Sequence, residues 1–97
     1  MDQTIASGSL RRQPGECLTR ASRGETFVIL RHGHPVAILR PPAGDEAFAR
    51  RSATMLWRNL RDLIAEARRE AVVITWYGEG AAVLEPLPPD WHFGVEP

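Results

Sequence analysis

The sequence predicts an α+β protein in which one strand–helix–helix–β-hairpin unit occurs twice. Shifting the chain along itself by 45 positions, from Gly33 to Gly78, places residues 7–41 over residues 52–86 without a gap. Ten of the aligned pairs are identical, and several others, such as Ser9/Thr54 and Ile38/Val83, keep their chemical character. A repeat near this period indicates one supersecondary unit used again, and two copies are too few for a solenoid.

The length of each copy predicts how the two are arranged. A copy of about 40 residues is near or below the size that folds unaided, so we expect the two tandem units to share one core as an intrachain pseudo-dimer. The expected divisions are a first unit over residues 1–41, a linker over 42–49, a second unit over 50–86 and an extended tail over 87–97.

Local signals define the elements of the first unit. The pair Pro14-Gly15 interrupts an amphipathic pattern, which predicts two short helices, and Gly24 ends the second of them. The pair His32-Gly33 separates two apolar runs and predicts a hairpin turn. The expected elements are a lead strand at 4–6, helices near 9–13 and 15–22, and hairpin strands at 25–31 and 34–40.

The second unit repeats this pattern with a more regular helix. Apolar residues recur at helical spacing from Leu56 to Ala67 and predict one amphipathic helix, with Ser52 or Thr54 as its cap. A lead strand is expected at 50–52, and hairpin strands at 71–76 and 79–84. The residues expected to be buried in both units are Leu18, Phe27, Ile29, Leu39, Leu63, Val72, Ile74 and Leu84.

Charge is unevenly distributed although the formal net charge is zero. Residues 1–41 hold six arginines and three acids, whereas residues 42–97 hold six arginines and nine acids. The chain contains no lysine, which a coding bias alone would explain, but arginine is also the better residue for base edges and phosphates. The imbalance favours the first unit for any contact with nucleic acid.

The chain shows no export or membrane signal. No apolar run approaches the roughly 18 residues that span a bilayer, and residues 1–10 lack the charge and apolar pattern of a signal peptide. Cys17 is the single cysteine, so an internal disulfide is impossible. We expect a cytoplasmic protein with no membrane partner, in which Cys17 is a small buried residue on a helix.

The first hairpin carries the pattern Gly-Glu-x-Phe-x-Ile-x-Arg-x-Gly-x-Pro-Val-Ala-x-Leu from Gly24 to Leu39, and the pair Leu10-Arg11 precedes it. These residues resemble the DNA-binding domain of the Phd/YefM antitoxins. The second copy is similar to the same domain, with the segment Arg58-Asn59-Leu60 in its first helix. The resemblance covers residues 4–41 and 50–86.

The resemblance implies a sequence-specific transcriptional regulator whose paired units bind a palindromic operator, as an antitoxin does when it represses its own toxin–antitoxin genes. The implied partner is double-stranded operator DNA, while a cognate toxin and pairing of two such chains are left open. The resemblance and the neighbouring polar groups assign DNA contacts to Ser9, Arg11, Arg12, Arg31, His32 and Arg58.

Two departures from the family pattern concern the second copy and the tail. Trp76 stands where the hairpin arginine is expected, so the first copy should dominate DNA binding. Family antitoxins carry a long segment that folds onto the toxin, whereas eleven residues follow Pro86 here, which argues against neutralisation of a toxin.

An alternative function is a protein-binding module that holds a toxin or a regulator, with its DNA-binding face decayed. Aromatic residues gather in the acidic half, where core packing is the simpler interpretation and a protein-binding patch is the other. Trp91 and Phe93 of the tail are the candidate partner anchors. The aromatic residues of this half are Trp57, Trp76, Tyr77, Trp91 and Phe93.

The residue pattern argues against an enzyme and against a bound cofactor. No nucleophile with a base and an orienting group, no glycine-rich phosphate loop and no metal-ligand spacing is present. His32 and His34 flank Gly33, but no third ligand for a metal accompanies them.

Overall fold

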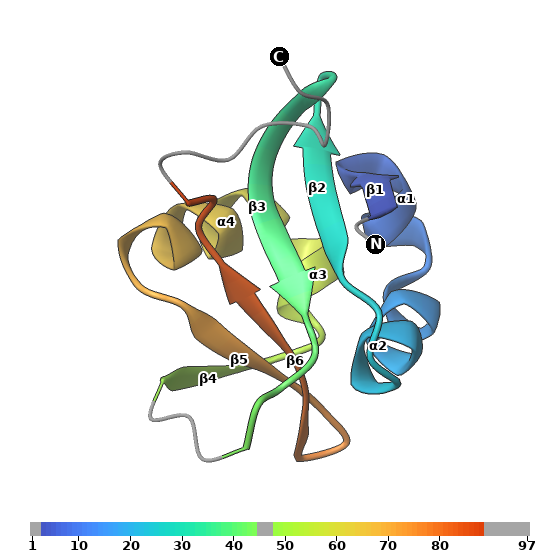
Figure 1. Ribbon diagram of the computed structural model, residues 1–97, viewed down its shortest axis with the longest axis vertical. Helices are drawn as coiled ribbons and strands as arrows, with labels where there is room; N and C mark the ends of the chain where they lie inside the picture. Colours follow the sequence, from blue (N-terminus) through green and yellow to red (C-terminus); the bar gives the residue numbers. More distant parts are fainter. Residues whose placement is uncertain (1–2, 45–47, 89–97) are drawn as a thin grey trace.

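Six strands form one mixed sheet in the computed structural model, which describes residues 3–44 and 48–88 (Figure 1). The strand order is β1-β2-β3-β6-β5-β4. The outer strands pair in parallel with their neighbours, β1 with β2 and β4 with β5, and the other pairs are antiparallel. The protein is therefore an α+β fold. Its strand order is symmetric, because β4, β5 and β6 of the second half take the places that β1, β2 and β3 take in the first half.

The first half follows the order that its sequence predicts. It comprises β1 (Gln3–Ala6), α1 (Ser7–Arg12), α2 (Pro14–Ser22), β2 (Phe27–Arg31) and β3 (His34–Arg40). The proline opens α2, a position where its missing N–H costs nothing. Both residues of the turn between β2 and β3 have positive φ, 53° and 78°, as a two-residue hairpin turn of type I′ requires.

The second half has the same order of elements. It comprises β4 (Ala49–Ser52), α3 (Met55–Arg58), α4 (Leu60–Arg69), β5 (Val72–Trp76) and β6 (Glu79–Glu85). The hairpin and the lead strand lie within a residue or two of their predicted positions. The turn between β5 and β6 again has two positive φ values, 53° and 84°.

The prediction of one continuous helix from Leu56 to Ala67 is wrong. Asn59 interrupts it with a ψ of 45°, as Gln13 with a ψ of 55° separates the helices of the first half. The predicted side-chain cap is also wrong, because Thr54 stands before α3 in a helical conformation and makes no capping hydrogen bond. Its backbone oxygen instead accepts a hydrogen bond from the N–H of Arg58.

The two hairpins have the same strand register. Phe27 lies opposite Leu39 in the first hairpin, and Val72 lies opposite Leu84 in the second. The second pair is the first pair shifted by 45 residues. Both ladders shift register at the same place, two residues beyond those pairs. In the ladder between β3 and β6, Leu39 lies opposite Leu84, so these two equivalent leucines mark its centre.

The gap-free alignment of the two copies fails in the helical region. The residues that separate the helices, Gln13 and Asn59, are 46 positions apart, whereas the hairpins differ by 45. The first half holds its extra residue between α2 and β2, where Gly24 turns with a φ of 109°. In the second half Glu70 is already extended, with φ −161° and ψ 138°, and leads directly toward β5.

All four helices contribute to one apolar cluster on a single face of the sheet (Figure 1). Alternate residues of the four central strands join this cluster, as the two-residue period of a strand requires. Cys17 lies in it on α2 and is buried, which raises the pKa of its thiol. The eight residues predicted to be buried are all 3% exposed or less: Leu18, Phe27, Ile29, Leu39, Leu63, Val72, Ile74 and Leu84.

A polar network ties β1 to α2 at the edge of the first half. The Arg20 guanidinium donates hydrogen bonds to the Glu25 carboxylate and to Gln3 Oε1, both at 2.7 Å from Nη2. Gln3 in turn donates to Glu25, and Arg20 also lies over the Phe27 ring, 5.0 Å from its centroid. Hydrogen bonds from Arg20 and then Gln3 hold the pKa of Glu25 below its ordinary value.

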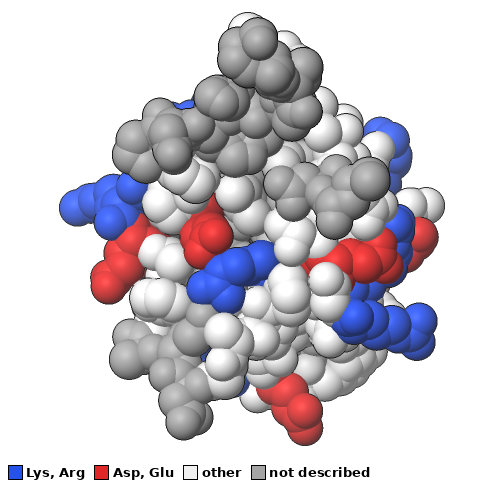
Figure 2. Space-filling view, in the orientation of Figure 1, with Lys and Arg blue, Asp and Glu red and all other residues white. Residues whose placement is uncertain are grey.

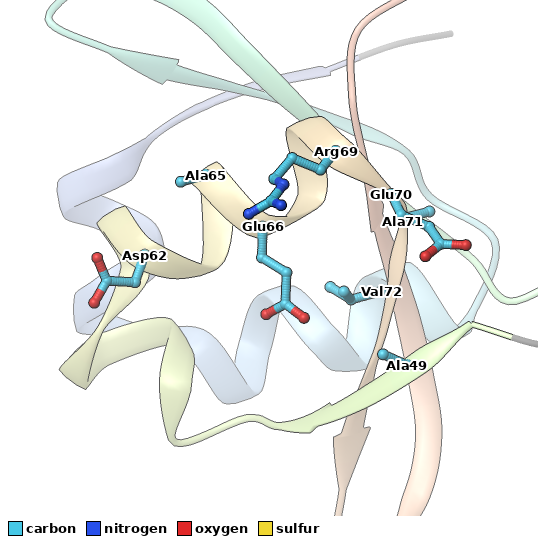
Figure 3. Close-up of a pocket in the computed structure, with 8 residues that line it drawn as sticks. All are labelled: Ala49, Asp62, Ala65, Glu66, Arg69, Glu70, Ala71 and Val72. Carbon is cyan, nitrogen blue, oxygen red and sulfur yellow. The ribbon is translucent and has the colours of Figure 1, made fainter.

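The equivalent place in the second half is a hollow of about 430 Å³ (Figure 3). Ala49 and Glu66 stand where the network has Gln3 and Arg20, so the same interactions cannot form. Glu66 instead accepts hydrogen bonds from Arg51 of β4, at 2.5 Å from Nη2. Asp62, Glu66 and Glu70 line this hollow with one arginine, which agrees with the acidic character of this half.

The face of the sheet opposite the helices carries mixed charges, and blue and red side chains lie next to each other in Figure 2. Arg40 of β3 donates to Glu85 of β6 at 2.8 Å, so an ion pair joins the two halves across the central ladder. These two equivalent positions, Arg40 and Glu85, thus carry opposite charges in the two copies.

Among the described residues, no helix has the length and apolar character that crossing a membrane requires.

Candidate nucleic-acid interface

The short first helices of the two halves, α1 and α3, pack against each other. Each ends on arginine, with Arg11 and Arg12 in the last turn of α1 and Arg58 in the last turn of α3. The buried side chains Leu10 and Leu56 fix both helices to the core, each with no exposed surface. The arginines that follow these leucines are therefore carried by helices that are anchored in the core.

Four arginines line two adjoining hollows beside these helices, and we call them the basic cluster: Arg11, Arg31, Arg58 and Arg61. The first hollow, about 230 Å³, is lined by Arg11, Arg58 and Arg61. The second, about 210 Å³, is lined by Arg11 and Arg61 again, together with Arg31 from the end of β2. Both halves of the chain thus contribute cations to one surface.

The charges of the basic cluster are not neutralised within the described part of the chain, because none of its four arginines forms an ion pair there. Asp62 is the single carboxylate among the described residues that line the two hollows. Several unpaired guanidinium groups on one surface repel one another, and a bound anion relieves this repulsion. Phosphate groups and base edges match the planar donor arrangement of arginine.

The structure places the remaining predicted contacts around this cluster. Arg12 is exposed, and its Nη2 donates to the Ser9 hydroxyl at 3.4 Å, outside both hollows. His32 is exposed at the hairpin turn next to Arg31 and lines neither hollow. The candidate partner anchors Trp91 and Phe93 lie outside the described residues.

Sequence reasoning missed Arg61. Under the helical offset of 46 positions, its counterpart in the first copy is Gly15, so the repeat does not mark it as a conserved feature of the unit. The available signal was its position as the second residue of α4. This signal was not sufficient, because the first turn of this helix lies close to the end of β2 only in the folded molecule.

The second half lacks an equivalent basic cluster. Trp57 follows the buried leucine of α3 where Arg11 follows that of α1, and Trp76 ends β5 where Arg31 ends β2. The segment Arg58-Asn59-Leu60, which was expected in the first helix of the second copy, instead spans the break between α3 and α4. Arg58 corresponds instead to Arg12.

No protein-family model, curated protein or solved structure matches this chain. The site is accordingly interpreted from its own geometry. The described residues contain no group of three or more histidine, cysteine or acidic side chains placed to hold a metal ion.

Proposed function

We propose that this protein is a sequence-specific DNA-binding regulator similar to the Phd/YefM antitoxins, with two such units fused as an intrachain pseudo-dimer. The observation that carries the proposal is the basic cluster, in which arginines from α1, β2, α3 and α4 meet without carboxylate partners. The matching strand registers of the two hairpins and the symmetric strand order support the fused arrangement.

In this proposal the arginines have two tasks. Arg11 and Arg31, two of the positions that the family resemblance marks, read base edges in the major groove, where arginine pairs with guanine through two hydrogen bonds. Arg58 and Arg61 contact phosphates and fix the orientation of the protein on the duplex. Since the second half has tryptophan at both reading positions, one half-site of the operator supplies most of the sequence readout.

The test is fluorescence anisotropy with the promoter upstream of the protein's own gene and a scrambled duplex, at two salt concentrations. Arg31→Ala and Arg11→Ala should each weaken binding to the promoter by about 1–3 kcal/mol. Arg58→Ala should cost less, because Arg58 lies in the half that lacks the reading arginines. Neutralisation of two to four phosphates predicts a slope of about −2 to −4 for log K against log salt.

Arg68→Ala is the matched control, because Arg68 is an exposed arginine of α4 outside both hollows. It should leave promoter affinity within about twofold of the unchanged protein. The proposal fails if the promoter is not preferred over scrambled DNA at low salt. It also fails if the changes at Arg31 and Arg68 have equal effects.

A further inference from the structure

The second half carries an aromatic pocket at the place that is equivalent to the basic cluster. Trp57 and Trp76 replace Arg11 and Arg31 at matching positions of the helix and the strand. Tyr77 replaces the histidine of the first hairpin turn, and both residues have a φ of 53°. The two sites share their backbone framework and differ in chemistry.

Helix α2 of the first half packs against the Trp76 ring of the pocket through a glycine. Gly15, the second residue of α2, stands where α4 has Arg61. A Cβ atom at Gly15 would lie 3.4 Å from Cζ2 and Cη2 of Trp76, so the indole ring lies directly against the helix backbone. An arginine at this position, as in α4, would meet the ring. The glycine therefore leaves room for an aromatic side chain that the basic cluster does not contain.

The pocket has a volume of about 410 Å³ and presents aromatic surface to solvent. Trp57 is 38% exposed and Tyr77 is 89% exposed, although both are large apolar side chains. The rings of Trp76 and Tyr77 meet edge to face, with centroids 4.9 Å apart. The residues that line it are Ser52, Ala53, Thr54, Trp57, Thr75, Trp76, Tyr77 and Gly78.

One carboxylate lies next to the pocket. None of the described residues that line the pocket carries a charge, and Glu79 lies opposite Trp76 in the strand ladder. Glu79 forms no ion pair within the described residues. The first hairpin has His34 at the position of Glu79. Aromatic faces beside unpaired carboxylates attract cations and repel phosphate.

We propose that this pocket binds an arginine or lysine side chain from a segment of a partner protein. The faces of Trp57 and Trp76 supply cation–π contact, and Glu79 supplies complementary charge. The inference goes beyond DNA binding and does not depend on it, because no residue of the basic cluster takes part. The chain then presents two sites of opposite preference, one for a polyanion and one for a cationic peptide.

The test uses the ¹⁵N-labelled full chain and a capped five-residue peptide with arginine between two leucines. Addition of the peptide at about 1–5 mM should shift the indole N–H signals of Trp57 and Trp76 in a saturable way. The signals are assigned by single Trp→Phe changes. An otherwise identical peptide with citrulline, which keeps the shape of arginine without its charge, should bind about fivefold to tenfold more weakly.

Two variants install the residue that the first half has at the equivalent place, and both positions are exposed, so the fold should be retained. Trp57→Arg should abolish the saturable shift at Trp76, and Glu79→His should weaken the arginine peptide by about threefold. Arg11→Ala should leave peptide binding unchanged. Equal binding of the citrulline peptide, absence of a saturable shift, or displacement of these signals by duplex DNA alone would overturn the proposal.

Discussion

Truncation of Leu84 to alanine tests whether the two halves share one core. Leu84 lies opposite Leu39 at the centre of the ladder between β3 and β6, and both side chains have no exposed surface. The change removes three carbons, worth about 2.4 kcal/mol at about 0.8 kcal/mol each. A residual cavity raises the expected loss of unfolding free energy to about 3–4 kcal/mol.

The measurement is urea unfolding followed by circular dichroism and tryptophan fluorescence. A chain of 97 residues is expected to have an unfolding free energy of about 5–15 kcal/mol, so the loss is a large share of it. With a slope near 1 kcal/mol per molar urea, the midpoint should fall by about 3 M. Both probes should report one coincident transition in the variant, as two-state unfolding requires.

Leu30→Ala is the control, because Leu30 lies in β2 outside the apolar cluster and is half-buried. It should cost clearly less than Leu84→Ala. A loss below about 1 kcal/mol at Leu84 would refute the reasoning from burial. Two separate transitions would refute the shared core and would mean that each half unfolds by itself.

Three further changes probe local features. Gly15→Ala should raise the unfolding free energy by about 0.5–1 kcal/mol, since alanine favours the helix and its Cβ just contacts Trp76; a loss in a thermal melt would show that the indole cannot yield. Gly78→Ala should lower it by about 1 kcal/mol, because φ there is 84°, and an unchanged melting temperature would contradict this. Glu25→Gln tests the lowered pKa of Glu25: its stabilisation is present above the ordinary glutamate pKa and is lost as pH falls through the folded value. The urea midpoints of the two proteins should therefore differ most near pH 7 and converge as pH falls below the ordinary glutamate pKa, and a constant difference would exclude this linkage.

Much of the secondary structure follows from local signals. His32-Gly33 and Tyr77-Gly78 predict the hairpin turns, because a two-residue turn needs positive φ at both positions. Pro14 predicts the break between the first two helices. The break at Asn59 was missed because no proline or glycine marks it, and the apolar spacing from Leu56 to Ala67 continues through it.

The candidate site was predictable in part. Arg11 and Arg31 were both expected to contact DNA, and they line the same hollow. Arg61 and the role of Gly15 were not predicted, since each depends on a contact between a helix of one half and a strand end of the other. The ungapped alignment also hid the match of Trp57 with Arg11, because one extra residue precedes β2 in the first half.

The sequence by itself determined the repeat, the α+β class, the hairpins and the apolar residues of the core. These features depend on spacing within a few residues, which the chain carries locally. Only the tertiary structure decided that β3 pairs with β6, so that Arg31 meets Arg61 while Trp76 meets Gly15. The physical reason is that the central ladder brings each hairpin end against the helix of the other half. The chemistry of each site is therefore set by residues that are far apart in the chain.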